Sequence, residues 1–465
     1  MFLDLSFINS KKKIIIALII FLSLSLMFIS LASLLGQKTF YNGVYIEGID
    51  VSGLTKDEAL IIVARKAEEI CNREKIILKY SDLRWSINLR DISFKYLIED
   101  AVDKAFSIGR TGNIFQRVRF IISLRSENIN ILLDPIFDIR KLENMLLSIK
   151  KQIDRETQNA AVQYKSGNIN LTREIPGRIM DIDKSVKIIE NEVVQRKFRD
   201  LELYISEQKP AIIYEDIKEI NSLISTFSTT FNPHDTNRTH NIKLACEKIN
   251  GSILKPGDVF SMNKALGPRT LENGYKDAPI IYKNELISGP GGGVCQVTTT
   301  LYGTVLKSKA DVIERVHHTL PLGYVDPGQD ATIAEDYIDF KFRNNMNYSL
   351  AVSAEVQGSS INIRLLGKKP DNDYIVKIKS HIIEQVLPED EEIIIDNNIP
   401  DGERIVVREA KKGLKVQVYR ETYTKNGQLI EREKISNDEY KPVKAQVKVN
   451  QNYTKQKPEA LNIIP

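Results

Sequence analysis

This chain contains few cysteines, which argues against a disulfide framework and against a structural metal site. The 465 residues include three cysteines, Cys71, Cys246 and Cys295. A disulfide framework normally uses an even and denser set, so at most one bridge can form and one thiol is left over. The sequence contains no CxxC pair and no close group of histidine and cysteine, and His234 and His240 do not share a helical face. We therefore expect no metal site and no cofactor.

The chain also lacks a strong excess of charge of either sign. Lysine and arginine number 65 and aspartate and glutamate 61, which gives a net charge of +4. A nucleic-acid-binding protein usually carries a strong basic patch, so we expect no nucleic-acid partner. Two common motifs are missing as well, because Gly291–Gly293 lacks the GKS or GKT ending of a phosphate loop and Ser107–Gly109 is not a nucleophile elbow.

One long apolar run lies near the N-terminus. It extends from Ile14 to Leu35, contains no charged residue and follows the lysines at 11–13. At about 1.5 Å per residue such a helix can cross a hydrocarbon core of about 30 Å. A cleaved signal peptide is the alternative, with 30–32 as its cleavage site, although its apolar region would span only about 7–15 residues. We expect an uncleaved transmembrane helix over 14–35, with a cytoplasmic tail over 1–13 and the bulk of the chain outside.

The rest of the chain is too long for one ordinary core and has the composition of globular protein, with 42% apolar and 27% charged residues. Changes in composition and pattern divide it into the regions 38–213, 225–367 and 374–449, followed by a flexible tail over 450–465. The first two regions mix strand and helix patterns, and the third alternates as strands do. We predict an α+β multidomain ectodomain behind one N-terminal transmembrane helix, with a small all-β module at the C-terminus.

In the first region the pattern of a strand, a turn and a capped helix occurs twice. Thr55 and Glu58 have the spacing of a capping box before one helix. The second helix follows the turn at 176–177, and Asp183 or Ser185 is expected to cap it.

The second region contains the stretch GPGGGVCQVTTTLYG at 289–303. Its run of three glycines ends one residue before Cys295, and an apolar helical periodicity begins near Gln296. Glycines let a backbone bend sharply or approach a ligand closely. Upstream, Asn237 or Thr239 is expected to start another helix.

Longer motifs in all three regions resemble known families. The second region reads NRTHNI, INGSILKPGDVFSMNKALGPRT, ENGYKDAPII, GGGVCQVTTTLYGTVL, ERVHHT and YVDPGQDATIAEDYIDFKFRNN in order, and it resembles the VanW family. Through GVYIEGIDVSGLTKDEA, AFSIGRTGN and IPGRIMDID, the first region is similar to the peptidoglycan-binding domain that often precedes a VanW block. The tail resembles the G-five domain and retains Gly402, Gly413 and Gly427 of its pattern. These resemblances imply an anchored or exported protein of the bacterial envelope and carry over no agreed activity.

Cys295 is the candidate nucleophile of the second region. At the N-terminus of a helix, the positive end of the helix dipole stabilises a thiolate and lowers its pKa. His318 is the candidate base and Asp330 the residue that orients it. The VanW family often reads ERHPHS where this chain reads ERVHHT, so Val316 replaces an earlier histidine and leaves one base. The alternative is a small buried cysteine that follows a tight turn.

A second polar set suits a carboxylate ligand. Arginine forks bind carboxylates, and the peptide stems of peptidoglycan carry free carboxylates, so we expect Arg238 or Arg269 to face the glycine backbone across a pocket. The predicted ligand-binding residues are Arg238, Asn241, Arg269, Gly291, Gly292, Gly293 and Gln296. Internal ion pairs of the two arginines are the alternative.

These expectations favour a membrane-anchored envelope protein that binds peptidoglycan or its stem peptides, with an accessory role in wall structure or the glycopeptide response. The competing hypothesis is a cysteine-dependent acyl-transfer or amidase enzyme that acts on stem peptides through Cys295, His318 and Asp330. A third interpretation is a scaffold whose partner is another envelope protein. Rapid alkylation of Cys295 below the ordinary thiol pKa of about 8.5 separates the enzyme from the other two.

Overall fold

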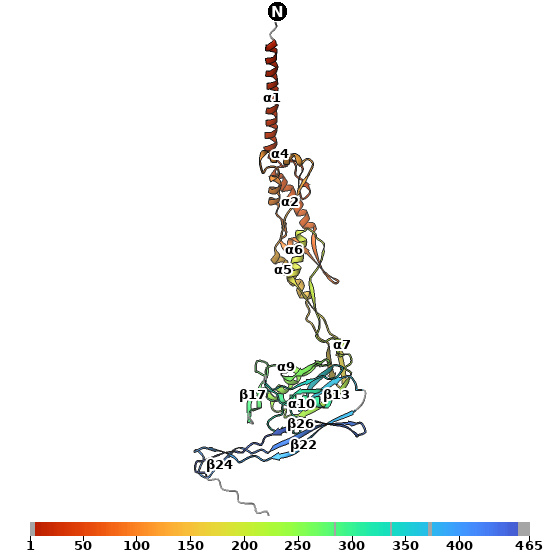
Figure 1. The fold of residues 1–465 in the computed structure, drawn as a ribbon, viewed down its shortest axis with the longest axis vertical. Coiled ribbons are helices and arrows are strands. Elements are labelled where there is room, and N and C mark those ends of the chain that lie inside the picture. Colours follow the sequence, from red (N-terminus) through yellow and green to blue (C-terminus); the bar gives the residue numbers. More distant parts are fainter. Residues whose placement is uncertain (1–4, 283–284, 335–336, 371–373, 454–465) are drawn as a thin grey trace, which may run out of the picture. The chain divides into compact units, whose positions relative to one another are not determined.

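A computed structural model describes residues 5–282, 285–334, 337–370 and 374–453 (Figure 1). Residues 1–4 of the predicted cytoplasmic tail and 454–465 of the predicted flexible tail lie outside the described residues.

The chain divides into two compact units. The first unit comprises Met1–Thr157 and Pro176–Lys209, and the second comprises Gln158–Ile175 and Pro210–Pro465.

The first unit begins with the apolar run, which forms α1 (Leu5–Leu35). The helix starts ahead of the lysines at 11–13, so these lysines lie within it. Its segment Lys12–Leu35 is long and apolar enough to cross a membrane by length and composition, a test that a signal sequence also passes.

The remainder of the first unit is an α+β arrangement around one buried core. Its elements are β1 (Val44–Ile46), β2 (Ile49–Asp50), α2 (Lys56–Arg73), β3 (Lys75–Tyr80), β4 (Leu83–Asn88), the 3-10 turn η1 (Leu89–Ile92), β5 (Lys95–Tyr96), α3 (Ile98–Ser107), α4 (Ile114–Ser123), β6 (Ile129–Ile131), β7 (Pro135–Ile136), α5 (Ile139–Ile153), β10 (Gly177–Met180), α6 (Ile182–Val194), β11 (Asp200–Glu202) and β12 (Ile205–Gln208). Small sheets join strands that are distant in sequence, in the orders β2-β1-β6 and β11-β3-β4.

Two helix starts in this unit test the capping rules. The capping box of Thr55 and Glu58 is confirmed at the start of α2. The predicted cap of α6 is wrong, because Asp181 rather than Asp183 or Ser185 accepts a hydrogen bond from the backbone N–H of Lys184. The cap therefore lies two residues before Asp183 and four before Ser185.

The second unit contains the VanW-like region and the C-terminal module. Its elements up to residue 367 are β8 (Ala161–Lys165), β9 (Asn168–Thr172), α7 (Tyr214–Ile217), β13 (Ser222–Thr230), α8 (Thr236–Ile249), β14 (Ile253–Leu254), β15 (Val259–Ser261), α9 (Met262–Leu266), β16 (Asp277–Tyr282), β17 (Glu285–Pro290), α10 (Val294–Ser308), β18 (Asp311–Glu314), β19 (Lys341–Arg343), β20 (Leu350–Gln357) and β21 (Ser360–Gly367). The hairpin of β8 and β9 belongs here because Ala160 and Val162 share a buried cluster with Leu366. The predicted first region, 38–213, is thus interrupted by a hairpin of the second unit.

The centre of the second unit is α10, which packs on β13 and β21 of the sheet ordered β13-β21-β20-β14 and against α8 (Figure 1). Gly303 allows this contact, since a Cβ atom there would lie 2.6 Å from the ring of Phe227. Apart from Cys295 and Lys307, which are partly exposed, the residues of α10 are buried. The core therefore fixes the helix while leaving the thiol near its N-terminus accessible.

The helix starts in this region differ slightly from expectation. Asp235 caps α8 by accepting a hydrogen bond from the backbone N–H of Arg238, so the predicted starts at Asn237 and Thr239 are wrong. The helix after the glycine run begins at Val294 rather than near Gln296, which places Cys295 in its first turn.

The C-terminal module is all-β, as predicted, within the residues that the structure describes beyond 373. Its strands are β22 (Tyr374–Val386), β23 (Glu392–Ile395), β24 (Arg404–Arg408), β25 (Gly413–Thr424), β26 (Leu429–Tyr440) and β27 (Gln446–Val449). They form two sheets in the orders β22-β25-β26 and β23-β27-β24. Val416, Val418 and Tyr440 form the buried cluster of the first sheet.

Candidate functional site

The glycine run places Cys295 by close packing. Gly293 caps α10 with a φ of 103°, and a Cβ atom there would lie 2.9 Å from the side chains of Arg238 and Ile242. A Cβ atom on Gly292 would lie 2.7 Å from the backbone of Ala278. Side chains at these positions would push the first turn of α10 away from α8 and β16, so the glycines set the position of the thiol.

Thr299 of α10 holds a segment that is distant in sequence beside Cys295. Thr299 Oγ1 donates to the carbonyl of Ala331 at 3.0 Å and accepts from the N–H of Ala331 at 3.1 Å. This pair of hydrogen bonds holds residues 330–333 beside the start of the helix. The Sγ atom of Cys295 then lies 3.6 Å from Thr332 Oγ1 and 3.7 Å from the carbonyl oxygen of Ile333.

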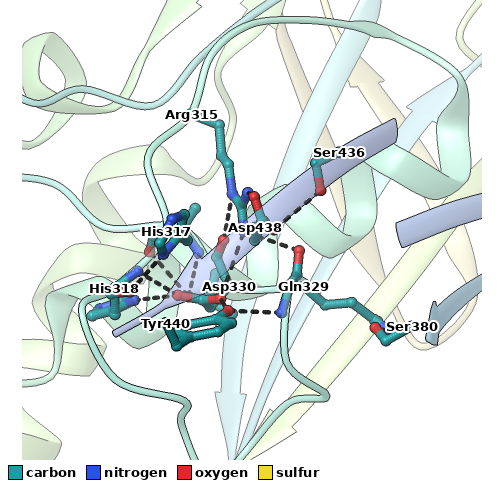
Figure 2. Close-up of polar contacts among 12 residues, drawn as sticks. Arg315, His317, His318, Gln329, Asp330, Ser380, Ser436, Asp438 and Tyr440 are labelled. Carbon is teal, nitrogen blue, oxygen red and sulfur yellow. Dashed lines mark hydrogen bonds and ion pairs between the residues drawn. The ribbon is translucent and has the colours of Figure 1, made fainter. Parts of the chain in front are cut away.

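The structure brings together the three residues predicted as a catalytic set. His318 Nδ1 lies 2.7 Å from Asp330 Oδ2, and the same oxygen accepts from the backbone N–H of His318 at 2.6 Å (Figure 2). The imidazole lies close enough to Cys295 for the two groups to shift each other's pKa, that of the thiol downward and that of the imidazole upward. Because Asp330 engages Nδ1, Nε2 is the ring nitrogen left for the thiol, which is the orientation of a nucleophile–base–carboxylate triad.

Mutual interactions shift the three pKa values toward an ion pair. Burial alone would raise the pKa of Cys295, but the hydrogen bond and charge of His318, with smaller contributions from Ile333 and Thr332, lower it to about 7. Burial alone would lower the pKa of His318, but the hydrogen bonds to Asp330 and Cys295 raise it to about 9. The lowered pKa of the thiol and the raised pKa of the imidazole together favour a thiolate beside an imidazolium near neutral pH.

Asp330 stays ionised throughout this range. Burial alone would raise its pKa, but hydrogen bonds from the side chain and backbone of His318 and from Tyr440 lower the pKa to about 2. A buried anion beside the imidazole stabilises its protonated form.

The neighbouring His317 points elsewhere. Its Nδ1 lies 2.7 Å from the carbonyl oxygen of His318, and its ring packs edge-on against Tyr440 at 5.0 Å between centroids. Adjacent residues in extended backbone face opposite sides, so one histidine of the pair reaches the thiol.

The predicted carboxylate pocket has a different geometry. Arg238 donates to Gln296 Oε1 at 2.6 Å, and the amide nitrogen of Gln296 donates to Thr229 and Thr230. Asn241 bonds to the backbone of Lys276 in both directions and donates to the carbonyl of Gly292. These side chains hold α8, β13 and the glycine run together.

Arg269 lies on the other side of the glycine run. Its guanidinium donates to Asn263 Oδ1 at 3.0 Å, and its methylene groups lie 3.3 Å from the position of a Cβ on Gly291. Arg238 and Arg269 thus flank the glycines and remain partly exposed. Their role in binding a ligand stays a prediction. Both guanidinium groups hydrogen-bond to amide side chains here, rather than forming the internal ion pairs of the alternative interpretation.

A cavity of about 600 Å³ opens near the carboxylate end of the triad. Gln329, the neighbour of Asp330, lines it together with Tyr324, and its cationic residues are Lys307, Lys377 and Lys379. Burial raises the pKa of Tyr324, and the charge of Cys295 adds to the rise, which places its phenol within electrostatic range of the thiol. Tyr324 also hydrogen-bonds to Thr299.

The sequence interpretation missed residues that surround the triad. Tyr324 and Thr332 lie within the VanW-like motif YVDPGQDATIAEDYIDFKFRNN, so their motif position was available as a signal. Tyr440 lies in another region of the sequence, and no local pattern connects it with Asp330. Among the described residues, no group of three or more histidine, cysteine, aspartate or glutamate side chains has the arrangement of a metal site.

Comparison with known families agrees with this architecture. Family models match the chain at residues 237–366 (VanW like protein), 85–202 (described as "Putative peptidoglycan binding domain") and 378–451 (G5 domain). Together with the α+β fold and its C-terminal β module, they define a cell-wall-associated protein.

Individual relatives narrow the assignment. The chain is 30% identical over 282 residues to "Uncharacterized protein YoaR" of Bacillus subtilis, covering 57% of this chain and 88% of the relative. The chain belongs to the VanW-like proteins. It is also 32% identical over 117 residues to "Vancomycin B-type resistance protein VanW" of Enterococcus faecalis, covering 24% of this chain and 42% of that protein. A solved structure titled "IgA1 Protease G5 domain structure" matches 18% of this chain and 98% of its own, at 21% identity and a TM-score of 0.13.

Proposed function

We propose that this chain is a cysteine-dependent acyl transferase that acts on the peptide stems of peptidoglycan. The observation that carries the proposal is the Cys295–His318–Asp330 array at the N-terminus of α10, with the thiol partly exposed and its pKa lowered to about 7. A structural cysteine in an apolar core has a raised pKa instead, as burial gives Cys246, whose pKa is about 12. The catalytic hypothesis is therefore favoured over the accessory wall binder.

The first half of the reaction forms a thioester. The thiolate of Cys295 attacks the carbonyl carbon of a stem-peptide amide, and the carbonyl electrons move to oxygen. In the first turn of α10 the N–H groups of Val294 and Gln296 donate to the carbonyls of Gly291 and Gly293, so the backbone N–H of Cys295 is the candidate donor to this oxyanion. The C–N bond then breaks, and the imidazolium of His318 gives its Nε2 proton to the departing amine.

The second half releases the acyl group. An amine of another stem peptide attacks the thioester carbonyl, neutral His318 takes the proton of that amine, and the C–S bond breaks to restore the thiolate. Water in place of the amine would give hydrolysis, the amidase form of the same chemistry. Asp330 keeps its negative charge throughout and orients the imidazole.

The substrate class follows from the neighbouring features. The peptidoglycan-binding family match at 85–202 supports retention of the chain at the wall. The charged residues that line the cavity beside Gln329 are three lysines and one aspartate, Asp326, and the excess of positive charge suits the free carboxylates of stem peptides. Arg238 and Arg269 beside the glycine run are a second candidate contact for such carboxylates.

We also infer that α1 anchors the chain in the membrane with the residues after Leu35 outside the cell. The lysines at 11–13 favour a cytoplasmic N-terminus, and peptidoglycan lies on the outer side. Alkaline washing of membranes should retain the full-length chain and release a variant in which charged residues interrupt α1. Release of the full-length chain by the same wash would contradict the anchor.

The proposal is tested with full-length protein in detergent, incubated with purified sacculi. The wild type should change the muropeptide pattern and show an acyl adduct on Cys295 by mass spectrometry, whereas Cys295→Ala should do neither. Cys71→Ala is the matched control, because Cys71 is also partly exposed but burial raises the pKa of its thiol. If wild type and Cys295→Ala both bind sacculi and neither alters them, the accessory binding function replaces this proposal.

A further inference from the structure

We propose that the C-terminal β module supplies a positioning residue to the Cys295 site. Tyr440, the last residue of β26, holds the carboxylate of Asp330, which in turn holds His318. This inference rests on the proposed function, because it assigns the module a part in the same site.

The two carboxylate oxygens of Asp330 accept hydrogen bonds from two different regions, the VanW-like region and the C-terminal β module. Oδ2 faces the VanW-like region and accepts from the Nδ1 and backbone N–H of His318. Oδ1 faces the module and accepts from the hydroxyl of Tyr440 at 2.5 Å (Figure 2). Both residues are 1% exposed, so protein groups rather than bulk water satisfy the carboxylate.

The phenol of Tyr440 is itself fixed. Its oxygen accepts a hydrogen bond from the backbone N–H of Gly328 at 2.7 Å, and its ring packs against His317. A hydroxyl that accepts one bond and donates another has a defined direction. Tyr440 is thus placed to prevent rotation of the Asp330 carboxylate.

A buried ion pair joins the VanW-like region to β26 of the module at the same place. Arg315 binds both oxygens of Asp438, at 2.7 and 2.8 Å, and it also donates to the backbone carbonyls of Asp330 and Gly328. Asp438 and Tyr440 are two residues apart on β26 and therefore face the same side. Since removal of one partner of a buried ion pair is strongly destabilising, this contact is unlike the exposed pairs of a domain surface.

Close backbone packing completes the contact. A Cβ atom on Gly328, whose φ is 87°, would lie 2.4 Å from a methyl group of Val418 in β25. The amide of Gln329 donates to Ser380 in β22 at 3.0 Å. Residues 328–330 are therefore covered by the module on the side opposite to His318.

Loss of the Tyr440 hydroxyl has a defined chemical consequence. Oδ1 of Asp330 would lose its hydrogen-bond donor and keep the guanidinium of Arg315 at 3.6 Å, so the carboxylate would be held less firmly against rotation about its Cβ–Cγ bond. The hydrogen bond to Nδ1 would then be held for less of the time, so the imidazolium and the thiolate would both lose stabilisation. The other titratable groups that face this carboxylate or its neighbours are Tyr302, Arg315, His317, Tyr324 and Asp438.

The test measures the rate of Cys295 alkylation by iodoacetamide on the full chain between about pH 5 and 10, using mass spectrometry of the Cys295 peptide. Tyr440→Phe should raise the midpoint by about one pKa unit, which slows alkylation at pH 7 about fivefold and leaves the high-pH plateau unchanged. Tyr419→Phe is the control, because its hydroxyl donates to Gln417 within the same module at 2.9 Å. Its profile should match that of the wild type.

A double-mutant cycle separates positioning from general stabilisation. Asp330→Asn sets the full effect, and Tyr440→Phe added to it should cause no further shift. An unchanged midpoint in folded Tyr440→Phe overturns the proposal, and so does an equal shift in both backgrounds. If thermal unfolding shows that Tyr440→Phe does not fold, Tyr440→Met, which also removes the hydroxyl and has a flexible apolar side chain, is judged by the same criterion.

The readout requires no substrate, so the two proposals can fail separately. A midpoint that shifts while sacculi stay unaltered refutes the acyl-transfer function and retains the positioning role of Tyr440. Sacculi that change while the midpoint stays constant would retain the acyl-transfer function and refute the positioning role of Tyr440.

Discussion

Replacing His318 with alanine removes the hydrogen bond and the positive charge that lower the pKa of Cys295 to about 7. The remaining influences are burial, which raises this pKa, and the hydrogen bonds with Ile333 and Thr332 and the dipole of α10, which lower it. A return to the ordinary value of 9.0 reduces the thiolate fraction at pH 7 from about one half to about one hundredth. Alkylation at pH 7 should therefore slow about fiftyfold, whereas the rates above about pH 10 should converge.

The assay is the iodoacetamide reaction of the full-length protein, with the modified Cys295 peptide quantified at several pH values. His240→Ala is the control, since His240 lies on α8 and contacts the carbonyl of Gly274 instead of the thiol. Equal alkylation rates of wild type and His318→Ala at pH 7 would refute the ion pair and, with it, the chemical basis of the proposed function.

Three other substitutions address stability and placement. Thr299→Val leaves the N–H and C=O of Ala331 without their buried partner and should lower the free energy of unfolding by about 2–4 kcal/mol in urea; an unchanged urea midpoint would contradict the role of this bond pair. Asp330 has a pKa of about 2 against an ordinary 3.8, so its contribution to stability is present above pH 3.8 and lost as the pH falls through 2. The stability difference between wild type and Asp330→Asn should shrink by about 2 kcal/mol over that interval, and a constant difference would count against the shift. Gly292→Ala places a Cβ 2.7 Å from the backbone of Ala278 and should slow alkylation of the nucleophile, so an unaltered rate would show that the loop yields freely.

Local sequence rules predicted the existence of the helices more accurately than the residues at which the helices begin. The capping box at Thr55 was predictable because its two partners are three residues apart in sequence. At α6, Asp181 and Asp183 are both residues that commonly cap a helix. Ile182 packs against the core of the first unit as part of the helix, so the cap is Asp181. Tertiary packing of this kind leaves no signature in a short window of sequence.

The reactive residues of the candidate site were predictable from the sequence, whereas the residues that hold them in place were less so. Residue types and family motifs identified Cys295, His318 and Asp330 as a set, and the fold brings them together. The contact between Asp330 and Tyr440 joins residues in regions that sequence patterns divide into separate domains. The amide of Asn241, a predicted ligand-binding residue, bonds to backbone in the structure, and its role toward a ligand stays a prediction. The same polar side chain suits either role, so only its neighbours distinguish them.

The burial of α10 affects how much the backbone that carries Cys295 can move. Thr300 and Thr304 donate their hydroxyls to carbonyls one turn back, and the sheet and α8 enclose the helix. Backbone amides in such a helix exchange with deuterium mainly through large-scale opening, whereas the segment from 316 to 334 contains little regular structure. The nucleophile thus stands on a buried helix, while its base and carboxylate come from a segment that side-chain hydrogen bonds to Thr299 and Tyr440 hold in place. Loss of those side-chain bonds should therefore change the reactivity of the thiol, and hydrogen exchange of residues 316–334 should record it first.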